Sequence, residues 1–173
     1  MRLWTIQPEF VWELLRETGV YRCNPKLSVY LSSHFNFGDG YDWLVKEMID
    51  RIGQPPTNVR YPVWAWHTFD WKRKKPDLRR VEFKGFPVPQ VCLEVEIPDD
   101  QVLLHDEVAW HCVLNKMPVI EADTIEEGEE KYTYLESLSL EDQTKYIVNS
   151  FKKTAAIKKE KISTLLSNWH LMY

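Results

Sequence analysis

Residues 90–98 (QVCLEVEIP) carry the clearest secondary-structure signal in the chain, and this signal requires a fold that contains β-structure. Apolar and other side chains alternate from Val91 to Ile97, which is the two-residue period of a strand with one apolar face. The opposite face of this strand carries Cys92, Glu94 and Glu96. Pro98 and the two aspartates after it end the pattern.

Residues 39–52 carry an equally clear helix pattern, so the fold must combine both kinds of element. The apolar residues that recur at helical spacing are Tyr41, Leu44, Val45, Met48 and Ile52. Asp39 is expected to cap the start of this helix, and Gly53 is expected to end it.

Weaker patterns place further elements around these two. Strands are expected at residues 1–7, 20–23, 62–69 and 81–83. Helices are expected over residues 8–18 with Gly19 just past the end, over residues 105–115 with Asp106 as the cap, and from Ser139 onward. The predicted class is α+β: a small mixed sheet with packed helices and a helical C-terminal segment. We divide the chain into an α+β core domain at residues 1–120 and a charged, mostly helical extension of the same domain at residues 121–173.

The segment from Tyr61 to Arg80 is the strongest candidate for a binding site. Residues 64–71 hold four aromatic side chains, and residues 72–80, hereafter the basic segment, hold six Lys or Arg and one Asp, a net charge of +5 in a chain of net charge −4. On a strand, Trp64 and Trp66 would lie side by side and could stack on a planar ligand, while the basic segment holds its phosphates. The alternative is that both indoles pack under a helix and the basic segment is solvated surface.

A second candidate site consists of Glu94 and Glu96. Two carboxylates on one strand face suit acid–base catalysis, so these two are the candidate catalytic residues. They suit ion pairs with Arg79 or Arg80 equally well. The turn signal at Pro76-Asp77 and the apolar Leu78 predict that Arg79 re-enters the fold and meets these carboxylates.

Several classes of site have no support in the sequence. The five histidines show no metal-ligand spacing, no glycine-rich phosphate loop is present, and neither a metal nor a cofactor is predicted. Three widely spaced cysteines favour a reducing, cytoplasmic location. The N-terminus lacks the pattern of a signal peptide, and no apolar stretch has membrane-spanning length, so no membrane partner is expected.

The motifs LWTIQ, WAW, KPDLR and LEVEIP, in this order, resemble an uncharacterised bacterial family known only as a domain of unknown function. The resemblance covers about residues 1–115, and residues 124–173 depart from the family's pattern. It implies no activity.

The order strand, helix, glycine, strand at the start of the chain is similar to the opening of ADP-ribosyltransferase-like folds. That similarity implies NAD as a cofactor, with Gln7 and Arg22 lining the cleft and Glu94 or Glu96 supplying the carboxylate. The sequence therefore leaves two functions open. The first is a binding module for an anionic planar ligand, a nucleotide or nucleic acid, with Trp64, Trp66, Lys75, Arg79 and Arg80 as its binding residues. The second is an NAD-dependent enzyme. The oligomeric state is not predicted.

Overall fold

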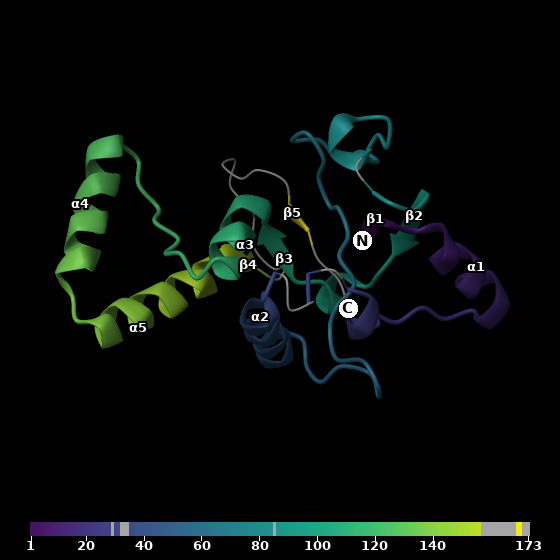
Figure 1. Ribbon diagram of the computed structural model, residues 1–173, viewed down its shortest axis with the longest axis horizontal. Coiled ribbons are helices and arrows are strands. Elements are labelled where there is room, and N and C mark those ends of the chain that lie inside the picture. The colour runs from purple at the N-terminus through teal and green to yellow at the C-terminus, as the bar shows by residue number, and fades with distance from the viewer. Residues whose placement is uncertain (29, 32–34, 85, 157–168, 171–173) are drawn as a thin grey trace.

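A computed structural model describes residues 1–28, 30–31, 35–84, 86–156 and 169–170 (Figure 1). Its α-helices are α1 (Glu9–Thr18), α2 (Gly38–Arg51), α3 (Glu107–Leu114), α4 (Ile125–Ser137) and α5 (Leu140–Phe151). Its strands are β1 (Arg2–Pro8), β2 (Gln90–Glu96), β3 (Leu104–Asp106), β4 (Ala155–Ala156) and β5 (Trp169–His170). The predicted α+β class is confirmed, and so is a helical C-terminal segment up to Phe151.

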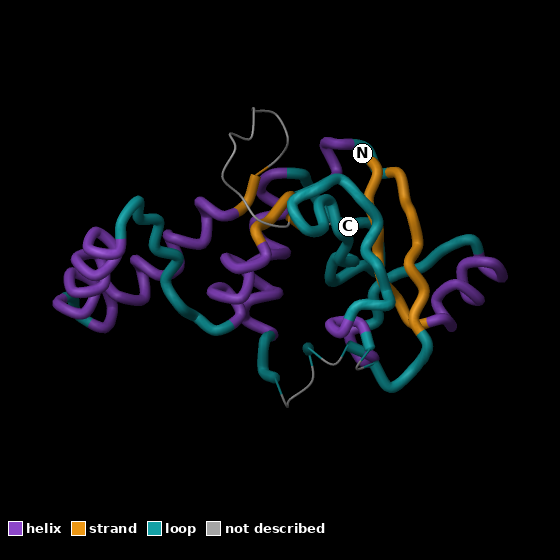
Figure 2. The backbone as a smooth tube through the Cα atoms, turned by 90° about the horizontal axis from the view of Figure 1, so that it is seen from above, coloured by secondary structure: helices purple, strands orange, loops and turns teal. Residues whose placement is uncertain are grey.

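The strands form two antiparallel groups. β1 and β2 pair along their whole length, with Leu3 opposite Val95 and Trp4 opposite Glu94, and Figure 2 shows them as two long strands side by side. The second group has the order β4-β3-β5. One face of the β1–β2 pair covers a small core of Leu3, Ala65, Val102 and Leu104, and Val95 and Ile97 pack against it. The end of the predicted apolar face that holds Val95 and Ile97 is therefore turned inward, as alternation requires.

The main core lies between α2, α3 and the end of α5. Its buried side chains include Tyr41, Leu44, Met48, Leu103, Trp110, Val113 and Phe151. The stripe predicted for α2 supplies three of these residues, because residues at helical spacing share one face.

Local capping signals account for several helix ends. Gly19 follows α1 in the left-handed region, with φ 72°, which glycine adopts without a steric penalty. The Asp106 side chain accepts a hydrogen bond of 2.9 Å from the Ala109 amide at the start of α3. The Ser139 hydroxyl does the same for the Asp142 amide at the start of α5. The predicted cap at Asp39 is wrong: α2 begins at Gly38, and the Asp39 carboxylate binds Lys116 at 2.6 Å instead.

Three predicted strands are absent from the described residues. Residues 20–23 are irregular and lead into a 3-10 turn at Pro25–Leu27, and residues 81–83 form a 3-10 turn, Val81–Phe83. Residues 62–69 run alongside β1 but pair with it only at Trp66, whose amide and carbonyl bond to Trp4 at 2.7 and 3.1 Å. Aromatic content suggested a strand here, but these rings pack against separate clusters instead of one sheet face.

Helices α4 and α5 form an arm that extends from the rest of the molecule (Figures 1 and 2). Of the thirteen residues of α4, only Leu135 is buried. Residues 152–161 carry five Lys and one Glu, and half of this stretch, residues 157–161, lies outside the described residues. Across the described part of the chain, helices long and apolar enough to cross a membrane are absent.

Candidate functional site

A two-residue β-turn projects Trp71 into solvent directly before the basic segment. Phe69 and Lys72 exchange both backbone hydrogen bonds, at 2.9 and 3.1 Å. The two residues between them, Asp70 and Trp71, have φ values of 48° and 62°. A hairpin turn with positive φ at both central positions matches the right-handed twist of its strands, and Asn-Gly or Asp-Gly usually occupies it. A tryptophan at the second position is therefore unusual, and its side chain is 67% exposed.

Aromatic side chains pack beneath this turn and support it. Phe69 is buried, and its ring lies 5.8 Å from Phe83 and 5.3 Å from Trp66. The Arg80 guanidinium lies over the Phe69 ring at 5.0 Å, an attractive cation–π geometry. The turn thus rests on a packed base.

Asp70 fastens the turn to the basic segment. Its carboxylate accepts hydrogen bonds from Lys74 Nζ at 2.8 Å and from Arg80 Nη1 at 2.6 Å. These two bonds hold the pKa of the Asp70 carboxyl below its ordinary value. The carboxylate therefore stays charged, and the turn stays fastened, throughout the neutral range.

Arg73 attaches the basic segment to β1. Its guanidinium donates to the carbonyl oxygens of His67 and Arg2, the latter at 2.6 Å, and lies 5.4 Å from the centre of the Trp4 ring. Burial and the nearby Arg2 charge lower the pKa of Arg73 below its ordinary value, but a guanidinium remains charged in proteins. Arg73 therefore fixes the start of the basic segment to the folded core. Its bonds go to uncharged carbonyl oxygens, so its positive charge is not neutralised by them.

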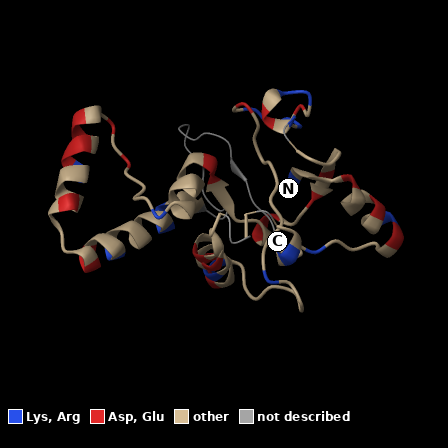
Figure 3. Cartoon of the chain, in the orientation of Figure 1, with Lys and Arg blue, Asp and Glu red and all other residues tan. Residues whose placement is uncertain are grey.

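Part of the positive charge of the basic segment is compensated and part is not. Lys74 pairs with Asp70, Arg79 with Asp77, and Arg80 with both Asp70 and Glu82. Among the residues that the structure describes, no carboxylate lies within 4.0 Å of Lys72, Arg73 or Lys75. Figure 3 shows Lys and Arg residues gathered on one loop. The turn and the basic segment together present an exposed indole beside three cations that form no ion pair within 4.0 Å among the described residues.

The predicted pair of stacking tryptophans does not form one surface. Trp64 packs into the main core, 4.8 Å from Trp110 and 6.3 Å from Tyr41. Trp66 packs beneath the turn, on Phe69 and Phe83. Both indoles are partly buried. Their positions agree with the alternative interpretation of the sequence, in which both indoles pack within the fold.

The prediction that Arg79 turns inward is wrong. Its side chain is 90% exposed and makes two bonds of 2.8 Å to the Asp77 carboxylate. The same carboxylate accepts the Arg79 amide at 3.1 Å. Asp77 thus closes a local turn that keeps Arg79 in solvent, and these bonds hold the pKa of the Asp77 carboxyl below its ordinary value. Arg80 and Lys75 are also exposed.

The two candidate catalytic carboxylates pair with Arg2 on the neighbouring strand. Glu94 accepts the Trp4 indole N–H at 2.9 Å and lies 3.3 Å from Arg2 Nε, and Glu96 lies 3.9 Å from Arg2 Nη2. Both carboxylates are exposed. The sequence suggested a cross-strand ion pair for these carboxylates, but with Arg79 or Arg80 as the partner instead of Arg2.

Gln7 and Arg22 were expected to line an NAD cleft. Among the described residues, no hydrogen bond joins the two. Gln7 bonds to the Thr5 hydroxyl at 2.7 Å and accepts the Tyr21 hydroxyl at 3.3 Å. The Arg22 side chain is exposed.

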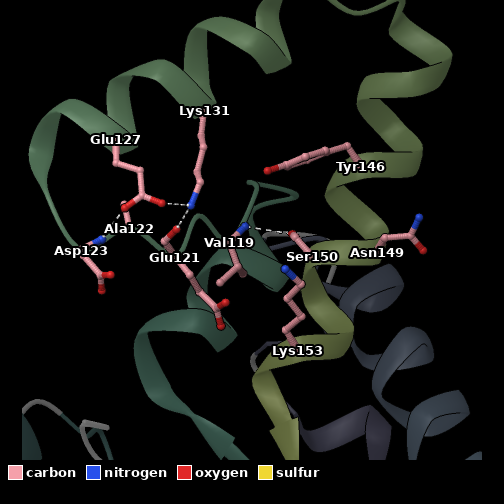
Figure 4. Close-up of a pocket in the computed structure, with 10 residues that line it drawn as sticks. All are labelled: Val119, Glu121, Ala122, Asp123, Glu127, Lys131, Tyr146, Asn149, Ser150 and Lys153. Atoms are coloured by element: carbon pink, nitrogen blue, oxygen red, sulfur yellow. Dashed lines mark hydrogen bonds and ion pairs between the residues drawn. The ribbon is translucent and has the colours of Figure 1, made fainter.

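A cavity of about 530 Å³ lies in the arm, away from every predicted site residue (Figure 4). It is lined by α4, α5 and the segment at residues 119–123. Lys131 crosses one wall and binds the Glu127 carboxylate and the Glu121 carbonyl, while Ser150 accepts the Val119 amide at 3.0 Å. These bonds join α4 and α5 each to the segment at residues 119–123. Within the described residues, no group of three metal-ligating side chains is found.

Sequence reasoning missed Trp71 as a site residue. The tetrapeptide FDWK at residues 69–72 contains only one turn signal, Asp70, which tolerates the left-handed region. An aromatic residue at the next position is not a signal for a two-residue turn, so the sequence predicts a strand that ends at Phe69 and no turn after it.

The comparisons with known proteins identify a family without a known activity. No curated protein and no solved structure matches the chain. One family model does match, described as a domain of unknown function (DUF3841), and the match covers residues 2–167. It therefore continues through α4 and α5, beyond the first 115 residues to which the motifs pointed. The chain belongs to the DUF3841 family.

Proposed function

We propose that this protein binds nucleic acid through the basic segment. The observation that supports this most is the set of three cations, Lys72, Arg73 and Lys75, that have no carboxylate partner among the described residues, in a chain whose net charge is −4. An acidic protein that concentrates uncompensated cations in one rigidly attached loop is suited to a local anionic contact.

The shape of the surface favours an extended polyanion over a free nucleotide. Small-molecule sites are concave and enclose most of their ligand. The basic segment instead follows an exposed turn, and Lys72, Lys74 and Lys75 are all exposed. A nucleic-acid strand can run along such a surface, since phosphate contacts need no enclosure.

NAD-dependent transfer is the less favoured function. A catalytic carboxylate in such an enzyme must be able to contact the ribose of its cofactor. Both oxygens of Glu94 already have partners in Trp4 and Arg2, and neither Glu94 nor Glu96 lines the cavity in Figure 4.

The test is the salt dependence of binding to a fluorescently labelled single-stranded 20-mer, followed by anisotropy. Each phosphate contact to a single strand contributes about −0.7 to the slope of log affinity against log salt, so three cations predict a slope of about −2. Replacing Lys72 and Lys75 together by serine should reduce this slope to about −0.7, because one cation remains.

The matched control is the double change Lys26→Ser and Lys145→Ser, which removes two exposed lysines from other parts of the surface. It should leave the slope unchanged. The absence of detectable binding to both DNA and RNA at low salt, by a protein with a normal thermal transition, would refute the proposal.

A further inference from the structure

We infer that Trp71 is a base-stacking side chain that makes the site selective for unpaired bases. This inference rests on the proposed function and adds to it the kind of nucleic acid that is recognised. It depends on how the turn presents Trp71, whereas the proposed function depends on charge.

The backbone at Trp71 is the first observation. A residue with a Cβ atom is disfavoured in the left-handed region, and a bulky one more so. Here both central residues of the turn, Asp70 and Trp71, have positive φ. Strained residues that a fold retains tend to cluster at functional positions. The conformation presents a large aromatic side chain that is 67% exposed.

The support beneath the turn is the second observation. Phe69 is buried, Arg80 lies over its ring at 5.0 Å, and the Asp70 carboxylate is bound by Lys74 and Arg80. These contacts fix the backbone on which Trp71 is mounted. A fixed platform loses less conformational entropy when a ligand binds than a mobile loop does.

The charges beside the turn are the third observation. Lys72 follows Trp71 directly, and Lys75 lies three residues further on. Aromatic side chains beside a cationic path are the usual means by which proteins bind single strands, since every base offers a face for stacking and every nucleotide offers a phosphate.

Duplex nucleic acid does not suit this arrangement. In a duplex the base faces are covered by neighbouring pairs, and only the base edges are accessible in the grooves. An indole on a projecting turn can stack on a splayed-out base or on one at a strand end. The occupant that we infer is therefore single-stranded DNA or RNA.

The experiment compares three labelled probes of equal length and charge per strand. The probes are an oligothymidine 20-mer, the same backbone with abasic sites throughout, and a 20-base-pair duplex. Wild-type protein should bind the oligothymidine at least about fivefold more tightly than the abasic strand, the lower end of what one stacked base contributes. It should also bind the oligothymidine more tightly than the duplex.

Three variants test whether the preference for oligothymidine over the abasic strand depends on the Trp71 ring. Trp71→Ala should bind the oligothymidine and the abasic strand equally, with an unchanged salt slope. Trp71→Phe should keep most of the preference, because it retains an aromatic face. Trp12→Ala removes another exposed tryptophan, 46% accessible on α1, and should bind like wild type.

The outcomes separate this inference from the proposed function. Equal binding of the oligothymidine and the abasic strand by wild type would overturn the inference and leave the proposed function in place, as would a preference that persists in Trp71→Ala. Tighter binding of the duplex would also overturn it. Failure to bind any probe would overturn both.

Discussion

Burial in the fold favours the uncharged form of the His105 side chain. Its side chain has no exposed surface, its Nδ1 lies 2.9 Å from the Asp106 carbonyl oxygen, and its Nε2 lies 2.7 Å from the Thr154 hydroxyl. The rings of Trp43 and Trp110 lie 6.1 and 5.8 Å from the imidazole. Burial disfavours the charged form and lowers the pKa of His105 from 6.5 to about 4, opposed by the carbonyl and charge of Asp106.

This shift predicts a loss of stability in mild acid. Between pH 6.5 and about 4 the unfolded chain binds a proton at His105 that the folded chain does not. The free energy of unfolding therefore falls as the pH falls through this window, by about 1.4 kcal/mol per pH unit and about 3 kcal/mol in all. Urea unfolding measured from pH 7 to pH 4 checks the prediction.

The control for this prediction is His105→Gln, which keeps a hydrogen-bonding side chain and cannot titrate. Its stability is expected to be lower at pH 7 but to depend less on pH below 6.5. Parallel stability curves for the two proteins would show that His105 is not the group responsible.

At the scale of single residues, the predictions that held concern interactions local in sequence, although the equally local cap at Asp39 was wrong. The caps at Asp106 and Ser139 bind amides three residues away, and Gly19 ends α1 by its own backbone conformation. The carboxylates predicted to pair with Arg79 were wrong. Whether Arg79 meets Asp77 or Glu94 depends on how the whole segment is placed in the fold. Trp71 was missed because an unfavourable backbone conformation has no signature in residue type.

Helix α2 contains two glycines whose surroundings differ, although they are only two residues apart. A Cβ atom added to Gly38 would meet nothing within 4 Å, whereas one added to Gly40 would lie 3.3 Å from Leu114 Cδ2 and 3.4 Å from Leu114 Cα. Gly40 thus allows α2 and α3 to approach closely.

The two glycines should respond differently to alanine. Gly38→Ala is expected to raise the free energy of unfolding by about 0.5–1 kcal/mol, because alanine restricts the unfolded chain and favours the helix. Gly40→Ala is expected to give no increase, because the backbone of α3 must shift to admit the methyl group. Urea titration of both variants tests this, and equal stabilisation by the two changes would contradict it.

Helices and strands were predictable where apolar residues repeat with one period and pack against a single core. Residues 39–52 and 90–97 each turn a single apolar face inward, so their periodicity is visible in the sequence. Residues 62–69 were not predictable in this way. Trp64 belongs to the main core, Ala65 to the smaller one and Trp66 to the support of the turn, so their alternation reflects separate clusters and not a sheet.

Across the whole molecule, the most acidic helix and the basic segment lie far apart. Helix α4 carries five Glu and one Lys, whereas the basic segment has a net charge of +5. Figure 3 shows the acidic arm at one end of the long axis and the basic loop in the other half. The sequence predicted the separation of charge along the chain, but only the fold determines that the arm extends away from the basic segment.

The acidic arm should have little influence on nucleic-acid binding at physiological salt. Charges further apart than the Debye length, about 8 Å at 0.15 M, are largely screened from one another. The triple change Glu126→Gln, Glu129→Gln and Glu130→Gln should therefore alter affinity for the 20-mer less than about twofold at 0.15 M salt, and more at 0.01 M. Anisotropy titrations at both salt concentrations measure this, and a large gain at 0.15 M would place the arm beside the bound strand.

The separation of charge in Figure 3 also has a kinetic consequence. A basic segment in one half and an acidic helix at the opposite end contribute an electric dipole along the molecule, and at low salt a polyanion's field rotates such a dipole before contact. Encounters from many starting orientations then lead to docking, so the association rate constant is raised and falls as salt is added. The dissociation rate constant is set by short-range contacts and does not share this benefit. The electrostatic arrangement thus makes capture fast without making release slow.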